Sequence, residues 1–390
     1  MELFKKKKEC CGCSICMSVC PVQAITMQAD EQGFLYPHID DKKCIHCGKC
    51  ERECSLKNLN NLDDVALNGV LAVINKDEKI RMSSSSGGFF YTIAEYVLQN
   101  GGTVYGAMFD ENYRVLHKRG TRIEDICRMQ GSKYVQSNTN GIFELVKKDI
   151  LDDKIVLFTG CPCQIDGLNH YLKGYNQEKL ITCDLICHGV NSPRLWEDYL
   201  SCMKKKDNIL DIHFREKTQG WKNISMHIKM EKKTYVEISA YDYFYQAFFS
   251  GHSLRPVCFS CPYASLDRKS DITMGDFWGI ENVFPEIDDD KGVSLILLNS
   301  YKGRMIFEQI KQKFVVRPTT VETCMQPSLK SPVQKPISYD AFWADYMDRG
   351  YGYICKKYFH GGIIGKVRRF IKTMMIRAKI WNKFSVLLRG

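Results

Sequence analysis

Two cysteine-rich stretches decide how the first part of this chain folds. Residues 10–21 read CCGCSICMSVCP, and residues 44–54 read CIHCGKCEREC. In both stretches four cysteines are separated by two, two and three residues; proline follows the first set and Ser55 follows the second. With this spacing, three neighbouring thiolates can surround one side of a metal cluster while the fourth points away to complete another.

The doubled spacing is the pattern of bacterial two-cluster ferredoxins. It predicts two [4Fe–4S] clusters, one held by Cys10, Cys13, Cys16 and Cys54 and the other by Cys44, Cys47, Cys50 and Cys20. Residues 33–37, which read GFLYP, suit a hairpin between the two runs. Cys11 is out of register, so we expect it not to be a ligand. A pair of zinc sites is the alternative, but zinc ribbons need only two C-x2-C pairs.

Composition and charge narrow the class of protein. The chain has 390 residues, 44% of them hydrophobic and 26% charged, and no apolar run approaches the roughly 20 residues of a membrane span. Cysteines rather than an apolar stretch follow the lysine-rich residues 1–9, which argues against a signal peptide. We therefore expect a cytoplasmic protein whose nineteen cysteines stay reduced and are available as metal ligands. The net charge of +10 is concentrated in the tail, so we expect no nucleic-acid partner.

The pattern beyond the cysteine runs predicts an α+β protein in three parts. Residues 1–60 form the small two-cluster ferredoxin-like domain, residues 65–355 form a larger mixed α/β domain, and residues 361–390 form a basic tail. Strands are expected over residues 70–75, 103–109, 113–118, 154–158 and 180–186, with helices over 89–100 and from 164 to 172. Residues 209–214, 224–230 and 234–239 suggest an antiparallel meander.

Three features of the larger domain are candidates for chemistry. Residues 83–88, SSSSGG, precede a helix and can cradle a phosphate, although a flexible loop is an equal alternative. Residues 271–279, DITMGDFWG, resemble either a strand end approached by a planar ring or a simple tight turn. The third feature is a dispersed set of thiols that can hold a third [4Fe–4S] cluster: Cys163, Cys187, Cys258 and Cys261, with Cys161 and Cys183 as rival ligands. Buried, reduced core cysteines are the alternative for this set.

The combination of these motifs resembles the coenzyme F420 hydrogenase/dehydrogenase beta-subunit family. The motifs are the cysteine runs, residues 85–88 (SSGG), 131–137 (GSKYVQS), 160–164 (GCPCQ), 187–189 (CHG), 258–261 (CFSC) and 275–279 (GDFWG), in the family's order. The sequence has Cys161 where some members have threonine, which leaves that thiol open as a ligand, a redox thiol or a bystander.

The resemblance implies an FAD-containing iron–sulfur oxidoreductase that exchanges electrons between clusters, flavin and an organic acceptor or donor. By the same resemblance, the flavin would lie near Ser86, Gly87, Gly88, Lys133, Tyr134 and Gln136, and the dispersed thiols match the family's cysteine positions. The expected partners are a redox protein or low-potential electron donor and a small organic substrate. Some similar bacterial proteins are associated with surface-polysaccharide synthesis, which suggests a substrate class. An electron-transfer subunit serving a separate catalytic partner is the alternative function, and a zinc-binding interaction module is a further one.

The tail adds a possible membrane contact. Residues 366–389 carry eight Lys and Arg residues and no acidic residue, and their apolar positions recur in steps of three and four. A basic amphipathic helix is typical of a segment that binds a membrane surface or a partner. A terminal helix packed on the body is an equal alternative.

Overall fold

An eight-stranded mixed sheet organises most of the chain in this computed structural model, which describes residues 3–59, 67–205, 207–359 and 374. The strands follow the order β13 (Phe314–Pro318), β3 (Gly69–Asn75), β12 (Ser294–Leu298), β11 (Ile272–Asp276), β7 (Leu180–Leu185), β6 (Val156–Gly160), β4 (Thr103–Phe109) and β5 (Val115–Gly120). Strands β11, β7, β6 and β4 are parallel, and the outer pairs are antiparallel. The parallel strands therefore end at one common edge, where ligand-binding loops are normally found.

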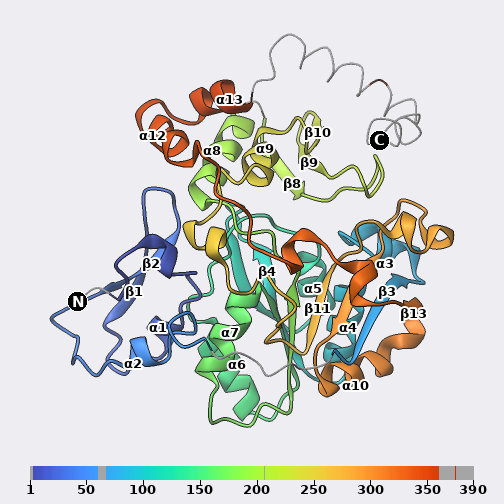
Figure 1. Cartoon of the computed structure of the whole chain (residues 1–390), viewed down its shortest axis with the longest axis horizontal. Helices are drawn as coiled ribbons and strands as arrows, with labels where there is room; N and C mark the ends of the chain where they lie inside the picture. The colour runs from blue at the N-terminus through green and yellow to red at the C-terminus, as the bar shows by residue number, and fades with distance from the viewer. Residues whose placement is uncertain (1–2, 60–66, 206, 360–373, 375–390) are drawn as a thin grey trace. The chain divides into compact units, whose positions relative to one another are not determined.

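Helices cover both faces of this sheet (Figure 1). One face packs against α4 (Phe89–Gln99), α5 (Ile123–Met129) and α10 (Tyr301–Ile310), and the other against α6 (Ile142–Leu151) and α7 (Pro162–Tyr171). Strand β6 shows the alternation that produces two cores: Leu157 belongs to the first core, and Val156 and Phe158 belong to the second. A three-layer arrangement of helices, sheet and helices results.

The cysteine runs flank a hairpin as expected. Strands β1 (Ile25–Ala29) and β2 (Leu35–Ile39) pair antiparallel, with Ala29 opposite Leu35. The short helices α1 (Ile15–Ser18) and α2 (Lys49–Arg52) each contain the third cysteine of a run. Ile15 and Val19 are buried in the same core as α6 and α7, so the ferredoxin-like segment shares a core with the larger sheet.

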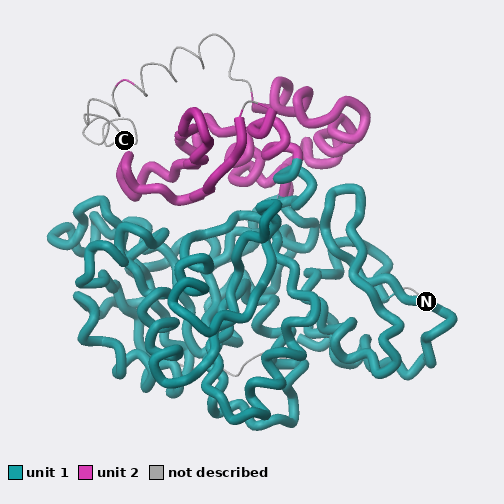
Figure 2. Tube along the Cα trace, turned by 180° about the vertical axis from the view of Figure 1, so that it is seen from behind, with its two compact units in different colours: residues 1–197, 254–334 teal, residues 198–253, 335–390 magenta. Residues whose placement is uncertain are grey.

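The described chain divides into two compact units, coloured separately in Figure 2. The first comprises residues 1–197 and 254–334, and the second residues 198–253 and 335–390. This division differs from the expected parts 1–60, 65–355 and 361–390, because the shared core joins the ferredoxin-like segment to the sheet. The helix α8 (Pro193–Lys204) contains the boundary, and the tail over residues 361–390 lies outside the described residues apart from Met374.

The second unit contains the expected meander. Strands β8 (Ile209–His213), β9 (Ser225–Met230) and β10 (Thr234–Ile238) form an antiparallel sheet in which β9 is central. The helices α9 (Tyr243–Phe249), α12 (Tyr339–Arg349) and α13 (Tyr351–Phe359) complete this unit. The predicted α+β class is confirmed, and each expected strand lies within two residues of an observed one.

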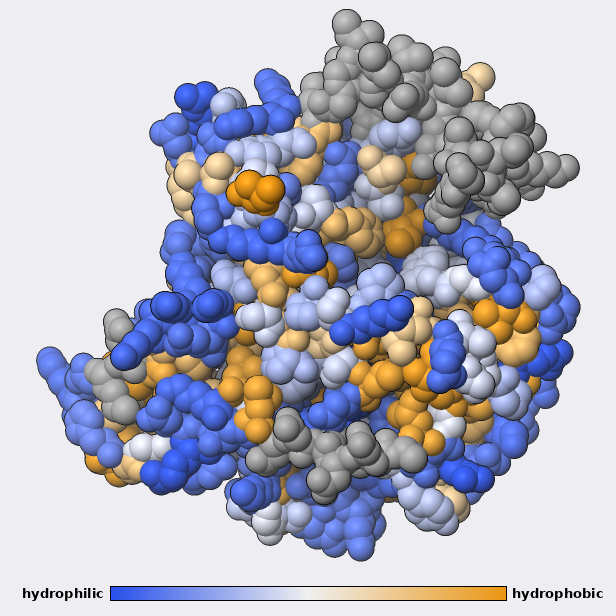
Figure 3. All heavy atoms as spheres, in the orientation of Figure 1, coloured by the Kyte–Doolittle hydropathy of each residue, from blue (hydrophilic) through white to orange (hydrophobic). Residues whose placement is uncertain are grey.

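The surface visible in Figure 3 is largely hydrophilic, with apolar residues showing between the polar ones. Within the described residues, no helix combines the length and the apolar character needed to cross a bilayer.

Candidate iron–sulfur and flavin sites

The two cysteine runs adopt the same local conformation. In the first run Gly12 and Ser14 flank Cys13 with φ of 73° and 69°, and in the second His46 and Gly48 flank Cys47 with φ of 53° and 69°. Two left-handed residues around the middle cysteine turn successive backbone N–H groups toward one side, as in the anion-binding loops called nests. Such a loop suits an anionic cluster, and its repetition supports a cluster at each run.

One of the two predicted ligand sets surrounds a common pocket. Cys20 lines one pocket together with Cys44, Cys47 and Cys50, although it lies 24 residues before Cys44 in the chain. The remaining four predicted ligands are all buried: Cys10, Cys13, Cys16 and Cys54. The two sets differ in exposure. Cys47 in the set around the pocket is exposed, whereas all four cysteines of the other set are buried. We call the buried group the inner cluster site and the other the outer cluster site.

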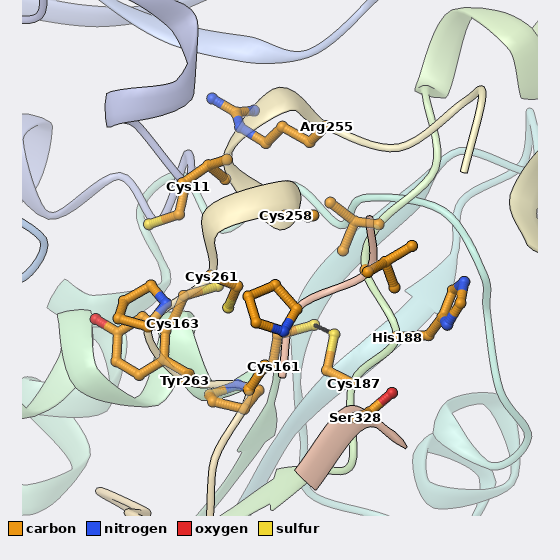
Figure 4. Close-up of a pocket in the computed structure, with 18 of the residues that line it drawn as sticks. Cys11, Cys161, Cys163, Cys187, His188, Arg255, Cys258, Cys261, Tyr263 and Ser328 are labelled. Carbon is orange, nitrogen blue, oxygen red and sulfur yellow. Dashed lines mark hydrogen bonds between the residues drawn. The ribbon is translucent and has the colours of Figure 1, made fainter. Parts of the chain in front are cut away.

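A third group of thiols surrounds a pocket at the carboxyl ends of β6 and β7 (Figure 4). The pocket contains about 720 Å³ of non-protein space, part of it open to solvent. Cys161 precedes α7, Cys187 follows β7, and Cys258 and Cys261 come from the short 3-10 helix Pro256–Ser260 and the residue after it. Six thiols line the pocket: Cys11, Cys161, Cys163, Cys187, Cys258 and Cys261.

The structure thus brings together the four thiols predicted for a third cluster and adds two more. Of the rivals, Cys161 belongs to the pocket, with its Sγ 3.9 Å from that of Cys187. Cys183 does not, because it points from β7 into the core on the other face of the sheet. Cys11 contacts the thiols of both Cys13 and Cys163, so it lies between the inner cluster site and this pocket.

Burial makes these thiols dependent on a positive partner. It raises the pKa of the Cys261 thiol to about 11 and that of Cys258 further. A thiolate buried here would be unfavourable by itself, and coordination to iron supplies the compensating positive charge. Among the described residues, no group of three or more His, Cys, Asp or Glu side chains is arranged to hold a single metal ion.

The two segments expected near a flavin are neighbours in the structure. The backbone N–H of Ser132 donates to Ser85 Oγ at 2.7 Å, and Gln130 Nε2 donates to Ser84 Oγ at 2.7 Å. Both segments lie on the loops at the carboxyl edge of the sheet, and Gly88, with φ of 91°, begins α4 there. This arrangement leaves the first turn of an 11-residue helix beside the second loop, which suits a bound phosphate.

The individual residues within these segments have specific structural partners. The Ser86 hydroxyl donates to the carbonyl of Val293, and the Gly87 N–H donates to Ser294 Oγ. Lys133 Nζ donates to the last carbonyls of α5 and the residues after it, at Met129, Gln130 and Gly131. Burial lowers the pKa of Lys133 to about 7, whereas its three carbonyl acceptors favour the charged form.

Gln136 lines the cysteine pocket at this edge. Gln136 Nε2 donates to the carbonyl of Cys11 at 3.0 Å, and its Oε1 accepts from Arg255 at 2.8 Å. The carbonyl of Tyr134 accepts from Asn191. Of the residues that the resemblance links to flavin, Gln136 therefore lines the cysteine pocket, whereas Ser86, Gly87 and Gly88 form the serine–glycine loop.

Comparison with known proteins agrees with both parts of this geometry. Residues 153–322 match the family described as the C terminus of the beta subunit of coenzyme F420 hydrogenase/dehydrogenase, and residues 9–58 match the 4Fe-4S dicluster domain. Residues 153–322 belong to this beta-subunit family. The chain therefore contains a dicluster domain, with two [4Fe–4S] clusters, and a segment of an oxidoreductase beta-subunit family.

Two curated relatives match only the ferredoxin-like segment of this chain. Both are methylamine utilization ferredoxin-type proteins MauM. The protein from Methylobacillus flagellatus is 45% identical over 50 residues, 12% of this chain and 21% of the relative, and the one from Methylophilus methylotrophus is 45% identical over 49 residues, 11% and 22%. The chain thus spans about a fifth of the length of these relatives. A chain of the F420-reducing [NiFe] hydrogenase complex from Methanosarcina barkeri aligns with a TM-score of 0.46 and 17% identity, over 67% of this chain and 84% of that one.

Arg255 is a site residue that sequence reasoning missed. Its side chain is fully buried between the inner cluster site and the cysteine pocket. A single arginine three positions before a C-x2-C pair has no distinctive spacing, so no signal in the sequence separates it from a surface arginine. Only the packing of the hairpin residues Leu35 and Tyr36 against it reveals its position.

Proposed function

We propose that this protein is an iron–sulfur flavoprotein oxidoreductase that passes electrons between its clusters and FAD, and on to an organic two-electron acceptor or donor. The observation that carries the proposal is the contact of Cys11 with Cys13 on one side and Cys163 on the other. Cys11 thus contacts a predicted ligand of the inner cluster and also lines the six-thiol pocket. Iron–sulfur clusters transfer one electron at a time and flavins exchange two, so a chain with both connects the two kinds of chemistry.

We assign a third [4Fe–4S] cluster to Cys163, Cys187, Cys258 and Cys261. The four thiols come from three separate segments and meet at one end of parallel strands, where the pocket has space for a group larger than a single ion. Cys11 and Cys161 are then the two additional thiols beside it. Cys183, on the opposite face, has no part in this assignment.

We place the FAD phosphates at the start of α4, against the backbone of Ser86, Gly87 and Gly88 and the neighbouring segment that contains Lys133 and Tyr134. Negative phosphate groups are stabilised by the unpaired N–H groups of a helix N-terminus. Gln136 would contribute from the cysteine side, where the isoalloxazine ring has to approach a cluster to exchange electrons.

Anaerobic purification tests these assignments directly. We expect about twelve irons per chain, because three cubanes hold four each, and one FAD released on denaturation. The double variant Cys258→Ser, Cys261→Ser should lose about four irons, whereas the matched variant Cys183→Ser should lose none. Unchanged iron in the double variant would remove the third cluster from the proposal. Absence of flavin from protein supplied with FAD would leave an electron-transfer subunit as the function.

We further propose that residues 366–389 bind anionic membrane surfaces through their basic side chains. Full-length protein should sediment with vesicles rich in phosphatidylserine, and added salt should release it, because screening weakens such attraction. A chain that ends at residue 360 should stay in the supernatant. Equal sedimentation of both chains would reject the membrane contact.

A further inference from the structure

Arg255 occupies an unusual position for a cation. Its side chain is 0% exposed, and its guanidinium stacks over the ring of Tyr36, with Cζ 4.1 Å from the ring centroid. Nε donates to the carbonyl of Cys10 at 2.8 Å, and Nη2 donates to the carbonyl of Leu35 at 2.9 Å. Nη1 donates to Gln136 Oε1. Within the described part of the chain, Arg255 forms no ion pair with a carboxylate.

A buried charge without an opposite charge is strongly unfavourable, even when neutral acceptors satisfy its hydrogen bonds. The compensating charge must therefore come from the sulfur-bearing groups around it. Nη2 lies 3.6 Å from Cys10 Sγ, a predicted ligand of the inner cluster. On the other side, Arg255 is the residue immediately before the 3-10 helix that carries Cys258 (Figure 4).

Both neighbouring sites are anionic when they hold iron, since each cluster has four thiolate ligands. Arg255 contacts Cys10 Sγ on one side and directly precedes the segment of Cys258 on the other, so its charge lies beside both sites. Each electron added to either cluster increases the negative charge, so a nearby cation stabilises the reduced form more than the oxidised form.

We propose that Arg255 is a buried counter-charge shared by the inner cluster and the cluster at Cys163, Cys187, Cys258 and Cys261, and that it raises the reduction potential of both. The second half of this statement rests on the proposed third cluster, whereas the first half rests only on the dicluster domain. In the electron transfer itself, one electron leaves a one-electron donor, reduces the inner cluster and moves to its neighbour. No bond is formed or broken and no proton is transferred.

The shared position has a consequence for the transfer. One cation that favours reduction of both clusters shifts both potentials in the same direction, so it stabilises the electron on either cluster. Gln136 fixes the geometry, because its amide accepts from Arg255 and donates to the carbonyl of Cys11, the residue between the two sites. Gln136 is in this respect a positioning residue.

The test is a redox titration of the anaerobic full-length protein with dithionite as reductant. The electron paramagnetic resonance signals of the reduced clusters report the extent of reduction. Arg255→Gln removes the charge and keeps hydrogen-bond donors. We expect the equilibrium constant for reduction of the inner cluster to fall at least about tenfold, a shift of about 59 mV to lower potential for a one-electron couple. Arg255→Lys should restore most of the wild-type potential. Arg81→Gln, at a buried arginine that pairs with Asp289, should leave the potentials unchanged.

A second variant tests the idea without disturbing Arg255. Gln136→Glu is isosteric and places a carboxylate 2.8 Å from the guanidinium, so it should cancel the positive charge and lower the same potentials. Wild-type potentials in Arg255→Gln and in Gln136→Glu, at wild-type iron content, would overturn the proposal, and so would failure of Arg255→Lys to restore the potential. If only about eight irons are present, the third cluster is absent, and the shift at the inner cluster still decides the role of Arg255.

Discussion

His117 lies on β5 with its ring stacked on Phe158 and its Nε2 2.9 Å from the carbonyl of Thr159. The side chain is 3% exposed, and burial lowers its pKa to about 4. In the unfolded chain His117 therefore binds a proton near pH 6.5, whereas in the folded chain it binds one only near pH 4. The contribution of neutral His117 to the free energy of unfolding is fully present above about pH 6.5 and is lost as the pH falls toward 4.

We expect the free energy of unfolding to decrease by about 2 kcal/mol through His117 between about pH 7 and about pH 5. His117→Gln keeps a donor toward Thr159 and removes the titration, so its stability should depend less on pH by that amount. Denaturant unfolding of anaerobic protein at several pH values measures the difference. Parallel pH profiles for the two proteins would show that His117 is not the group responsible.

Gly87 illustrates a glycine needed for packing. A Cβ at this position would lie 2.3 Å from the carbonyl oxygen of Val73 and 2.7 Å from the backbone nitrogen of Ser294. These are strand backbone atoms that cannot move aside easily. Gly87→Ala should therefore reduce the free energy of unfolding by about 1–3 kcal/mol, as overpacking does.

The matched control is Gly352→Ala in α13, where a Cβ meets nothing within 4 Å. That change should leave stability equal or raise it by up to about 1 kcal/mol, because alanine is the better helix former. Thermal unfolding compares the two variants. Wild-type stability with lost FAD in Gly87→Ala would instead assign this glycine to the ligand alone.

At the scale of elements, the hairpin β1–β2 is attached to the body through its turn. The Ser192 hydroxyl donates to the carbonyl of Gln32, and a Cβ at Gly33 would lie 2.6 Å from the backbone nitrogen of Arg194. Gly33 also has φ of 82°, which an alanine adopts only with strain. The turn therefore fits against the start of α8 only when it carries a glycine.

We predict that Gly33→Ala weakens this attachment and increases amide hydrogen exchange across residues 25–39. Gly174→Ala is the control, because Gly174 has φ of 86° and nothing within 4 Å of its Cβ position. The two variants share the backbone strain and differ in the clash, so only Gly33→Ala should loosen the hairpin. Equal protection of the hairpin amides from exchange in the two variants would mean that the contact with α8 does not hold the hairpin in place.

The elements themselves were largely predictable from the sequence, because apolar periodicity within one segment sets them. The strands at 103–109 and 180–185 and the meander follow from local pattern. The order of the sheet does not, since β3 lies between β12 and β13, which come more than 200 residues later. Pairing over such separations depends on the whole core.

Some residues of the candidate site could likewise be predicted from the sequence, and others could not. The eight cysteines of the two runs could be assigned because their spacing encodes cluster geometry. Cys163, Cys187, Cys258 and Cys261 were predicted from strand ends and one C-x2-C pair, and the structure gathers them in one pocket. The positions of Cys11 and Arg255 could not be predicted, because they arise where the ferredoxin-like segment packs on the body.

At the scale of the molecule, this packing makes the ferredoxin-like segment part of the first unit. Ile15 and Val19 share a core with α6 and α7, and a Cβ at Gly167 would lie 3.0 Å from Cys13 Sγ. Removal of residues 1–66 would expose that core and would leave Arg255 without two of its carbonyl acceptors. The ferredoxin-like segment is therefore packed into the first unit and is not a separate domain joined to it only by a linker.

We predict that a chain lacking residues 1–66 binds a hydrophobic dye and unfolds at a lower temperature than the full chain. A chain that ends at residue 360 should retain the wild-type unfolding temperature, because it keeps both units as described. Calorimetry with a dye-binding assay distinguishes them. A body that remains soluble and unfolds cooperatively at the wild-type temperature after loss of residues 1–66 would contradict the shared core.

The unequal exposure of the two ferredoxin-like cluster sites has a consequence for damage by air. Cys47 is exposed and Ile45 beside it is 60% exposed, whereas the inner site is enclosed by the hairpin, α1 and Arg255. Dioxygen reaches a cluster by diffusion from solvent, so the outer cluster should be oxidised and lose iron first. On brief exposure to air we expect about four irons to be lost quickly while the inner cluster persists. The outer cluster would thus react with dioxygen before the inner cluster does and would delay damage to it.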